Sequence, residues 1–373
     1  MIKVLQIMDN ISIKSGVSSI VMNIYRNINR DRVQFDFLVS NKVDNSYENE
    51  IKKYGGNIFY SGNPLSPKTL VRTCINNKIF LMENKDNYKA VHLHSPTIAD
   101  MTIRYAKKIG IKNIIVHSHS TSFSTNSLKM IINSFLKRNL LNYANIYFAC
   151  STEAAYFLYG KEFFEEKEIK IIKNGVEPEK YRFNSHYKKN ILNEWRWNDY
   201  MVVCHTSNFS ALKNIEFLIP VIENLTKYRK DIRFLFLGDG PTRENFEKKL
   251  INRNLQEYCK FIGFTDKVNY YLNAADLFVL PSIKEGLPVA VVEAQANGIP
   301  CIISESITKE VKVGDVEFVP LNQNNWIHKI NSFKSLSDEE RKNKSYKFRN
   351  SEFNIIKQSK ILEDFYLKLN DWI

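Results

Sequence analysis

Short runs of apolar, β-branched residues alternate with longer segments of helical pattern along almost the whole chain. The runs are continuously apolar, which is typical of strands buried on both faces, and their alternation with helices indicates parallel sheets. The expected strands lie at residues 3–8, 35–39, 90–94, 113–119, 145–150, 169–172, 200–206, 232–238, 259–263, 276–281 and 300–304. The pattern therefore predicts an α/β protein of doubly wound parallel sheets.

This pattern occurs twice, with a break at residues 177–199 that is polar, contains a proline and has no strand-like run. A chain of 373 residues is long enough for two domains, each with its own core. We expect one Rossmann-like domain at residues 1–178, a second at 195–352 and a terminal helix at 354–373. Two such sheets predict a ligand cleft where the carboxyl ends of both sets of strands face each other.

Positive charge is concentrated in the first part of the chain. Residues 1–150 contain 20 Lys or Arg and 9 Asp or Glu, whereas residues 151–373 contain 33 and 31. Such a field favours a polyanion, either nucleic acid or an anionic membrane surface. No zinc-knuckle, RNA-recognition or helix-turn-helix signature accompanies the charge, so we expect the membrane surface and no nucleic acid.

Residues 128–143 have the pattern of an amphipathic helix with lysine and arginine on its polar face. Such a helix lies either in a membrane interface or, as an ordinary Rossmann helix, with its apolar stripe against the sheet. The second interpretation is the simpler one, and the uneven charge is the better argument for a membrane.

Three features favour the cytoplasm. The apolar stretch at the N-terminus spans only about six residues and has no small-residue cleavage site, unlike a signal peptide. No apolar run approaches the roughly 20 residues of a membrane-spanning helix. The five cysteines are scattered and form no C-x-x-C pair, as in a reducing compartment. We expect a cytoplasmic protein, peripheral at the inner face of the membrane.

The stretch from 276 to 304 is the most informative for function. It reads as strand, short loop, helix and strand, with Glu285 in the loop and Glu293 in the second turn of the helix. The amides around Gly286 and Leu287, together with the helix N-terminus, are typical of a phosphate site. The two carboxylates can accept hydrogen bonds from sugar and ribose hydroxyls. The stretch predicts a site for a phosphorylated sugar ligand.

The stretch EGLPVAVVE resembles the E-x7-E motif of glycosyltransferase family 4, retaining enzymes of the GT-B fold that include exopolysaccharide and capsule glycosyltransferases. The resemblance runs nearly end to end, through the similar segments SIKSGVSSIV, VHSHST, YFACSTEA, IIKNGVE and LGDGP in the family's usual order. It implies two Rossmann-like domains around a central cleft, with a terminal helix that crosses back to the first domain. The donor is then expected on the second domain and the acceptor on the basic first domain.

On the second domain, the resemblance assigns Glu285 to the hydroxyls of the donor sugar and Glu293 to the donor ribose. Lys213, in SALKN, matches the lysine that contacts the diphosphate. Gly286 and Leu287 are the expected backbone contacts of the donor.

On the first domain, Gly16 matches the loop glycine whose backbone approaches the donor phosphate. His119 matches the histidine that contacts the sugar near the bond to be broken, and His117 is the less favoured register. Asn174 begins an Asn-Gly turn, which in the family lies in the loop that enters the cleft.

Asn208 is a departure from the family pattern. It stands where the family has an arginine that contacts the diphosphate, and an asparagine cannot supply the charged, forked hydrogen bonds of arginine. Lys213 is then left alone on the diphosphate. This departure leaves open a catalytically weak partner or sugar-binding subunit, and a nucleotide-sugar 2-epimerase shares the fold.

Two H-x-H pairs, His92/His94 and His117/His119, end neighbouring expected strands. Four imidazoles at one edge are able to bind zinc. No Asp or Glu lies beside them, and no D-x-D motif is present, so we expect no metal and no cofactor beyond the nucleotide-sugar. Gly238-Asp239-Gly240 lacks the lysine and spacing of a Walker motif and is expected to be a strand-to-helix turn.

The resemblance thus implies a retaining hexosyltransferase that uses a nucleotide-diphosphate sugar, with a UDP-sugar favoured. The expected acceptor is a saccharide or lipid-linked saccharide of surface polysaccharide synthesis at the membrane.

Overall fold

The computed structural model describes residues 1–62, 67–94, 96–119 and 141–369. The chain forms two compact units, one made of Met1–Gly175 and the segment from Ile355 onward, the other of Val176–Asn354. The boundary therefore falls at Gly175, and the segment expected as a break between domains belongs to the second unit. It forms helices α8 (Pro178–Tyr181) and α9 (Ser185–Trp195), the latter capped by the Asn184 side chain.

The first unit is built on a parallel sheet of seven strands in the order β3-β2-β1-β4-β5-β6-β7. Its strands are β1 (Ile2–Met8), β2 (Val33–Val39), β3 (Ile58–Tyr60), β4 (Ala90–Leu93), β5 (Ile114–Ser118), β6 (Ile146–Ala149) and β7 (Ile169–Ile171). β2 is buried along its whole length, as the continuous apolar run predicts. The strand order reverses between β1 and β4, which makes that edge the expected ligand crevice of this unit.

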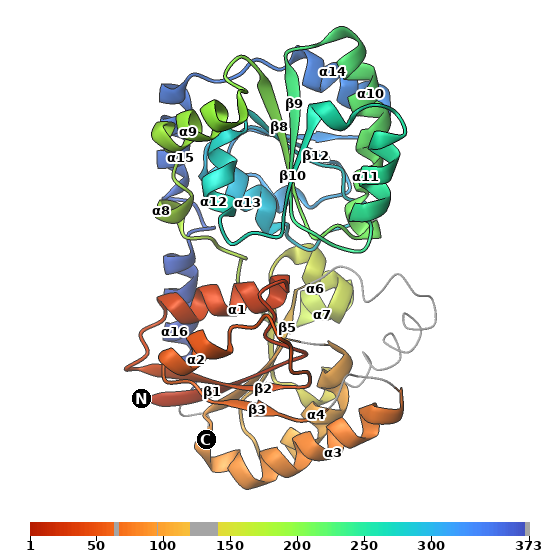
Figure 1. Ribbon diagram of the computed structural model, residues 1–373. Helices are drawn as coiled ribbons and strands as arrows, with labels where there is room; N and C mark the ends of the chain where they lie inside the picture. The colour runs from red at the N-terminus through yellow and green to blue at the C-terminus, as the bar shows by residue number, and fades with distance from the viewer. Residues whose placement is uncertain (63–66, 95, 120–140, 370–373) are drawn as a thin grey trace. The chain divides into compact units, whose positions relative to one another are not determined.

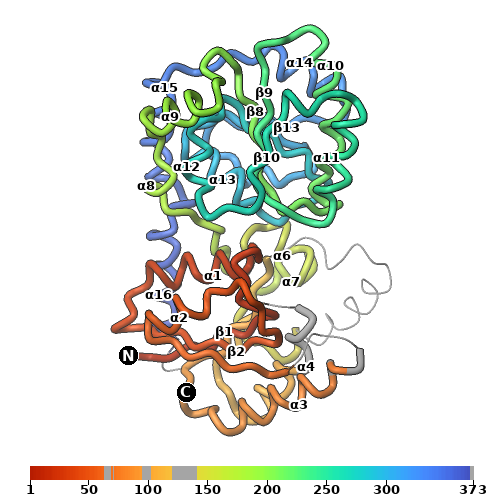
Figure 2. The backbone as a smooth tube through the Cα atoms, in the orientation of Figure 1, coloured from red at the N-terminus to blue at the C-terminus, as the bar shows by residue number. Residues whose placement is uncertain are grey.

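Helices cover both faces of this sheet, with α1 and α2 on one face and α3 and α4 on the other (Figure 1). The helices are α1 (Gly16–Asn27), α2 (Glu48–Lys53), α3 (Pro67–Asn84), α4 (Pro96–Lys108), α6 (Thr152–Tyr159), α7 (Lys161–Glu166) and α16 (Ile355–Lys368). The terminal α16 returns to this unit and packs beside α1 (Figure 2). Glu363 of α16 accepts from the Asn29 amide at 2.9 Å and pairs with Arg32 at 3.0 Å.

The second unit has a parallel sheet of six strands in the order β10-β9-β8-β11-β12-β13. Its strands are β8 (Met201–Thr206), β9 (Ile232–Leu237), β10 (Cys259–Gly263), β11 (Leu277–Leu280), β12 (Cys301–Ser304) and β13 (Val316–Val319). Its further helices are α10 (Leu218–Tyr228), α11 (Arg243–Ile251), α12 (Val268–Tyr271), α13 (Val289–Ala296), α14 (Gln323–Ser332) and α15 (Asp338–Phe348). Here the order reverses between β8 and β11.

All eleven expected strands are present, and two strands, β3 and β13, were not expected. In the described part of the chain, no helix is both long enough and apolar enough to cross a membrane. The five cysteines are free thiols.

Candidate functional site

In the second unit, the candidate donor residues follow β8 and β11, the two strands between which the sheet reverses. The loop after β8 contains Lys213, and the loop after β11 contains Glu285. The Ile283 amide donates to the Leu212 carbonyl at 2.9 Å, which fastens the two loops together. The site therefore lies at the carboxyl ends of the strands at the switch point, where ligands of open α/β sheets bind.

Lys213 and Glu285 form the ion pair at the centre of this edge. Lys213 Nζ lies 2.5 Å from Glu285 Oε1, and the side chains are 20% and 10% exposed. Ser282 Oγ donates to the same carboxylate oxygen at 2.7 Å. Because Glu285 is held by a charge and a hydroxyl and is almost covered, its orientation is fixed before any ligand binds.

The backbone around Lys213 explains how it reaches this place. Lys213 ends a short 3₁₀ turn (Ala211–Lys213), and Asn214 takes the left-handed conformation with φ 51°. Asparagine tolerates that conformation better than most residues, and here its amide also donates to the Pro281 carbonyl at 3.2 Å. The Lys-Asn pair is therefore a structural unit that joins the two loops.

The Gly238-Asp239-Gly240 segment is the predicted strand-to-helix turn, between β9 and α11. It lies directly against the loop after β8: a Cβ at Gly238 would come within 1.9 Å of the Ser207 carbonyl oxygen. The Phe209 amide donates to the Asp239 carbonyl at 3.1 Å. Both glycines are required by this close approach of two backbones.

Glu285, Gly286 and Leu287 lead directly into α13, which begins at Val289 after Pro288. Gly286 and Leu287 are buried. Glu293 lies in the second turn of the helix, as predicted, and its Oε1 accepts a 2.6 Å hydrogen bond from the hydroxyl of Tyr181. The N-terminus of α13 and the carboxylate of Glu293 thus both come directly after the loop that contains Glu285.

Burial raises the pKa of Glu293 to about 7, against the hydrogen bond from Tyr181 and the charge of Lys180, which lower it. The carboxyl group is therefore close to half protonated near neutral pH. The ionised group accepts hydrogen bonds from hydroxyls at both oxygens, whereas the protonated group accepts fewer and donates one, so its surroundings control how it holds a ligand.

Asn208, at the place of the family's arginine, is exposed at the start of the loop after β8. The Ser210 hydroxyl lies 3.5 Å from its side-chain oxygen. No charged group therefore stands at this position beside Lys213.

In the first unit, Gly16 is the first residue of α1, after the capping residue Ser15. The Ser15 hydroxyl accepts from the Ser18 amide at 3.3 Å. A Cβ at Gly16 would meet no atom within 4 Å, so there is open space above its backbone. Asn174 is buried and directly precedes Gly175, the last residue of the Met1–Gly175 segment of this unit.

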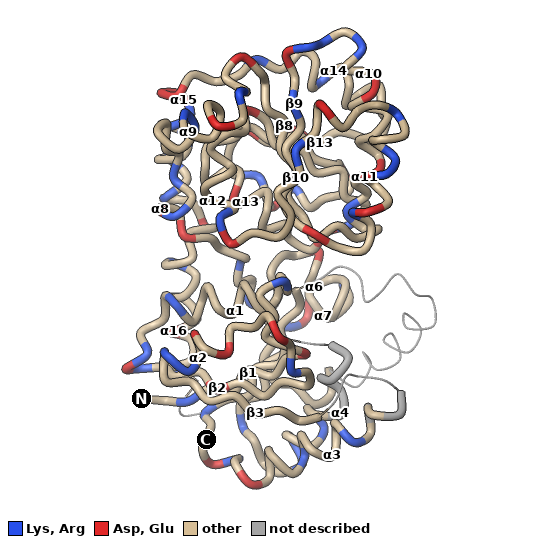
Figure 3. The backbone as a smooth tube through the Cα atoms, in the orientation of Figure 1, with Lys and Arg blue, Asp and Glu red and all other residues tan. Residues whose placement is uncertain are grey.

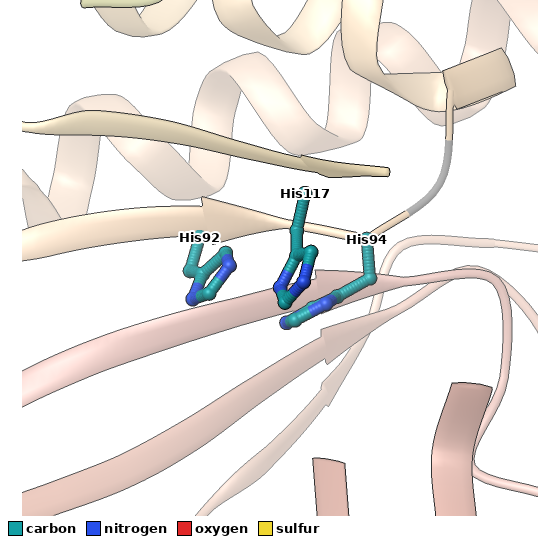
Figure 4. A group of neighbouring side chains, drawn as sticks. All are labelled: His92, His94 and His117. Carbon is teal, nitrogen blue, oxygen red and sulfur yellow. The ribbon is translucent and has the colours of Figure 1, made fainter. Parts of the chain in front are cut away.

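The two H-x-H pairs form one group, which we call the histidine cluster: the buried His92, His94 and His117 and the half-buried His119. His92 lies on β4, His117 on β5, and His94 and His119 directly after these strands. Neighbouring rings stack, with centroids 4.0 Å apart for His117 and His119 and 4.2 Å for His92 and His94. Three of the four are drawn in Figure 4.

Hydrogen bonds connect the cluster to two other elements. His94 Nε2 lies 2.7 Å from Gln6 Oε1 on β1, and its Nδ1 lies 2.8 Å from Nε2 of His119. His92 Nδ1 lies 2.6 Å from the hydroxyl of Tyr366 on α16. The cluster therefore spans the β1–β4 reversal of this sheet.

Burial lowers the pKa of every histidine in the cluster, that of His119 to about 3. All four imidazoles are consequently neutral at physiological pH, with lone pairs available.

Three residues of these sites were not identified from the sequence. Ser282 holds Glu285, Tyr181 holds Glu293, and His205 on β8 binds the Ser207 hydroxyl at 2.8 Å and the Val279 carbonyl at 3.0 Å. Ser282 lies only three residues before Glu285 and could have been predicted, whereas Tyr181 is distant in sequence from Glu293. The expected amphipathic helix at 128–143 lies largely outside the described residues.

Comparison with known proteins agrees with this fold. The family model described as "Glycosyltransferase Family 4" matches residues 14–180, and the model "Glycosyl transferases group 1" matches residues 188–350. A putative glycosyltransferase EpsF of Bacillus subtilis is 31% identical over 309 residues, covering 81% of this chain and 79% of that protein. The chain therefore belongs to glycosyltransferase family 4 and is a glycosyltransferase.

Other relatives carry more specific names. A UDP-Gal:alpha-D-GlcNAc-diphosphoundecaprenol alpha-1,3-galactosyltransferase of Escherichia coli is 24% identical, covering 78% of each chain. The capsular polysaccharide biosynthesis glycosyltransferase CapH of Staphylococcus aureus is 26% identical, covering 83% of this chain and 82% of that protein.

Among solved structures, Anabaena HepE in complex with UDP and glucose matches with a TM-score of 0.78 at 14% identity, covering 98% of this chain and 99% of that one. This likeness shows the fold, two Rossmann-like domains of the GT-B type.

Proposed function

We propose that this protein transfers a sugar from a nucleotide-diphosphate sugar, with UDP-sugars favoured, to a saccharide or lipid-linked saccharide, with retention of configuration. The observation that carries the proposal is the pair Lys213–Glu285 at the switch point of the second sheet, 2.5 Å apart and mostly covered. The names of the relatives support a role in surface polysaccharide synthesis, and one of them names a UDP-sugar and a lipid-linked acceptor.

In this proposal, each residue acts by position and charge. Lys213 has three N–H donors, of which one reaches Glu285, so the others can bind the leaving diphosphate. Glu285, held by Ser282, accepts hydrogen bonds from the donor sugar, and Glu293 accepts them from the ribose. The open space above Gly16 admits a phosphate to the N-terminus of α1. The acceptor hydroxyl then attacks the face that the diphosphate leaves, as in other retaining members of the family.

We further propose that the first unit binds an anionic membrane surface through α3. Four apolar side chains at helical spacing are between 47% and 57% exposed on this helix: Val71, Ile75, Ile79 and Met82. Arg72 and Lys78 lie on the same helix, and residues 1–150, which contain it, have 20 Lys or Arg against 9 Asp or Glu. Figure 3 marks the Lys and Arg residues of this unit in blue. An apolar stripe flanked by basic residues fits the interface of an anionic bilayer, where a lipid-linked acceptor is located.

The donor site is tested by binding and hydrolysis across a panel of UDP-, GDP-, ADP- and dTDP-sugars without added metal. The wild type is compared with Glu293→Ala, and with Glu257→Ala as a control at an exposed glutamate outside the site. We expect one donor, a UDP-sugar, to bind the wild type and the control and to lose most of its affinity for Glu293→Ala. Absence of binding by every donor would contradict the proposal.

The exposed Asn208 favours one alternative, a sugar-binding partner subunit with little activity of its own. Analysis of products distinguishes the cases. Transfer to an acceptor supports the enzyme, conversion of the donor without acceptor indicates a 2-epimerase, and binding without turnover indicates the partner subunit.

A further inference from the structure

The histidine cluster gathers four possible metal ligands at one edge of the first sheet, and one of them, His119, is the residue assigned to the donor sugar. β4 and β5 pair in parallel, with His92 opposite Ile115 and Leu93 opposite Val116. Since alternate residues of a strand point to the same face, all four imidazoles project from one face of the sheet. For His92, His94 and His117, a set of ring nitrogens, one from each residue, lies within 4.8 Å of one another (Figure 4).

Several nitrogens of the cluster have no hydrogen-bond partner although they are buried. They are Nε2 of His92, both ring nitrogens of His117 and Nδ1 of His119. Leaving a buried polar atom unsatisfied costs about 1–3 kcal/mol. His117 is 1% exposed and its ring nitrogens have no hydrogen-bond partner in the described part of the chain, so packing alone gives no reason for an imidazole there.

Two hydrogen bonds of the cluster are of the kind that a metal site uses, whereas a third, between His94 Nδ1 and His119 Nε2, occupies a nitrogen that a metal would need. Histidine ligands usually give their second ring N–H to a fixed acceptor, which sets the tautomer and directs the other nitrogen at the metal. Gln6 Oε1, at 2.7 Å, can accept from Nε2 of His94 and leave its Nδ1 for a metal. The Tyr366 oxygen, at 2.6 Å, can accept from Nδ1 of His92 and leave Nε2, which has no other partner.

We propose that His92, His94 and His117 bind a divalent transition metal ion, with zinc as the best fit. Zinc takes neutral imidazoles at about 2.0–2.1 Å, and sites with three histidines keep a fourth position for water or a ligand. The cluster contains no carboxylate, which disfavours magnesium and calcium, since these prefer oxygen ligands. The rings of His92 and His117 are now stacked with 11° between their planes, so the imidazoles must turn about their side-chain bonds before three nitrogens converge on one ion.

Metal binding would also affect His119. Nδ1 of His94 is now 2.8 Å from His119 Nε2, and the metal would take this lone pair. His119 would then either turn to another partner or become the fourth ligand. The sequence alone favoured other uses for these histidines, and the positions of Gln6 and Tyr366 are what change that interpretation.

The test uses full-length protein stripped of metal with a chelator. Zinc binding is measured by calorimetry, and zinc content by elemental analysis after dialysis. We expect one saturable equivalent per chain in the wild type and a rise in Tm with zinc, since the ion binds the folded state. His117→Phe should lose both effects. It keeps the ring stack and removes no hydrogen bond, so the metal-free protein should remain folded.

The control removes the exposed histidines of the second unit, in the double variant His186→Gln/His328→Gln, and should keep the bound equivalent. No saturable binding by the wild type, or binding that persists in His117→Phe, overturns the proposal. If His117→Phe does not fold, the visible spectrum of Co²⁺ bound to the wild type decides. Intense bands of a four-coordinate ion support the site, and the weak spectrum of a six-coordinate ion refutes it.

Discussion

The hydroxyl of Tyr181 donates a 2.6 Å hydrogen bond to Glu293, 112 residues further along the chain. This bond stabilises the ionised carboxylate, whereas burial acts against it and raises the pKa to about 7. Small changes of pH or of its surroundings therefore change the protonation state of Glu293, the carboxyl group assigned to the donor ribose.

The first prediction concerns stability. The pKa of Glu293 in the folded protein lies above the ordinary 4.5, so between pH 4.5 and about 7 the folded state binds more protons than the unfolded chain. Stability from this group is therefore present at low pH and is lost as the pH rises through that window. Glu293→Gln removes the charge, so its Tm should match that of the wild type at pH 5 and exceed it at pH 8.

The expected difference follows from the shift in pKa, which corresponds to at most about 3 kcal/mol, or roughly 6–12 °C in Tm for a unit of this size. Scanning fluorimetry at both pH values measures it. Glu257→Gln, at an exposed glutamate, should show no such dependence. An equal effect of Glu293→Gln at pH 5 and pH 8 would mean that the carboxyl group is not the cause.

Removal of the Tyr181 hydroxyl should change the pH dependence of donor binding. In Tyr181→Phe the hydrogen bond that lowers the pKa of Glu293 is lost, so this pKa should rise above about 7. The ionised carboxylate then forms only at higher pH, and the midpoint of donor affinity should shift upward with it. Calorimetric titrations between pH 6 and 9 measure the midpoint. Tyr228→Phe, at a tyrosine that is 84% exposed, is the matched control.

Most of the fold could be predicted from the sequence because its strands are continuous apolar runs. β13 was missed because Glu317 interrupts its apolar run, whereas β3 is as short as the predicted β7 and was not recognised. The stretch at 177–199 was read as a break because it has no strand. The structure shows instead that Asn184 caps a helix there, and that Ile191 and Leu192 are buried.

The candidate site was predictable where its residues are local in sequence, as for Glu285, Glu293 and the helix between them. The partners that orient these residues were not. Tyr181 reaches Glu293 only through the fold of the second unit, and Gln6 reaches His94 only because β1 pairs with β4. No sequence period links such residues, since the contacts depend on strand order.

The apolar stripe on α3 should control binding to anionic membranes. Ile75 and Ile79 are each 47% exposed, so Ile75→Glu/Ile79→Glu should leave the fold intact while it adds two negative charges at the surface. Sedimentation with vesicles of anionic and neutral lipids at low salt measures binding. We expect the wild type to bind anionic vesicles and the variant to lose at least about tenfold in affinity.

Ile251→Glu provides the control for this experiment, since Ile251 is 55% exposed on α11 of the second unit. That variant should bind vesicles like the wild type. If all three proteins bind anionic vesicles equally, the membrane contact lies elsewhere and the proposed role of α3 is wrong.

Asn208→Arg should strengthen donor binding. The position is exposed after β8, in the loop that also contains Lys213, so an arginine fits without disturbing the core. Its guanidinium would add charged hydrogen bonds to the diphosphate, and one such bond is worth about 1.5–3 kcal/mol. Allowing for solvent at an exposed position, we expect about a tenfold lower Kd and a faster transfer step.

Asn208→Gln separates charge from size, because it lengthens the side chain and leaves it neutral. Calorimetry and turnover with the preferred donor, at fixed ionic strength, compare the three proteins. If arginine and glutamine have the same effect, the diphosphate does not lie beside residue 208, and the placement of the donor on this edge is wrong. If arginine tightens binding but no transfer appears, the missing charge does not limit the reaction, and the partner-subunit alternative gains support.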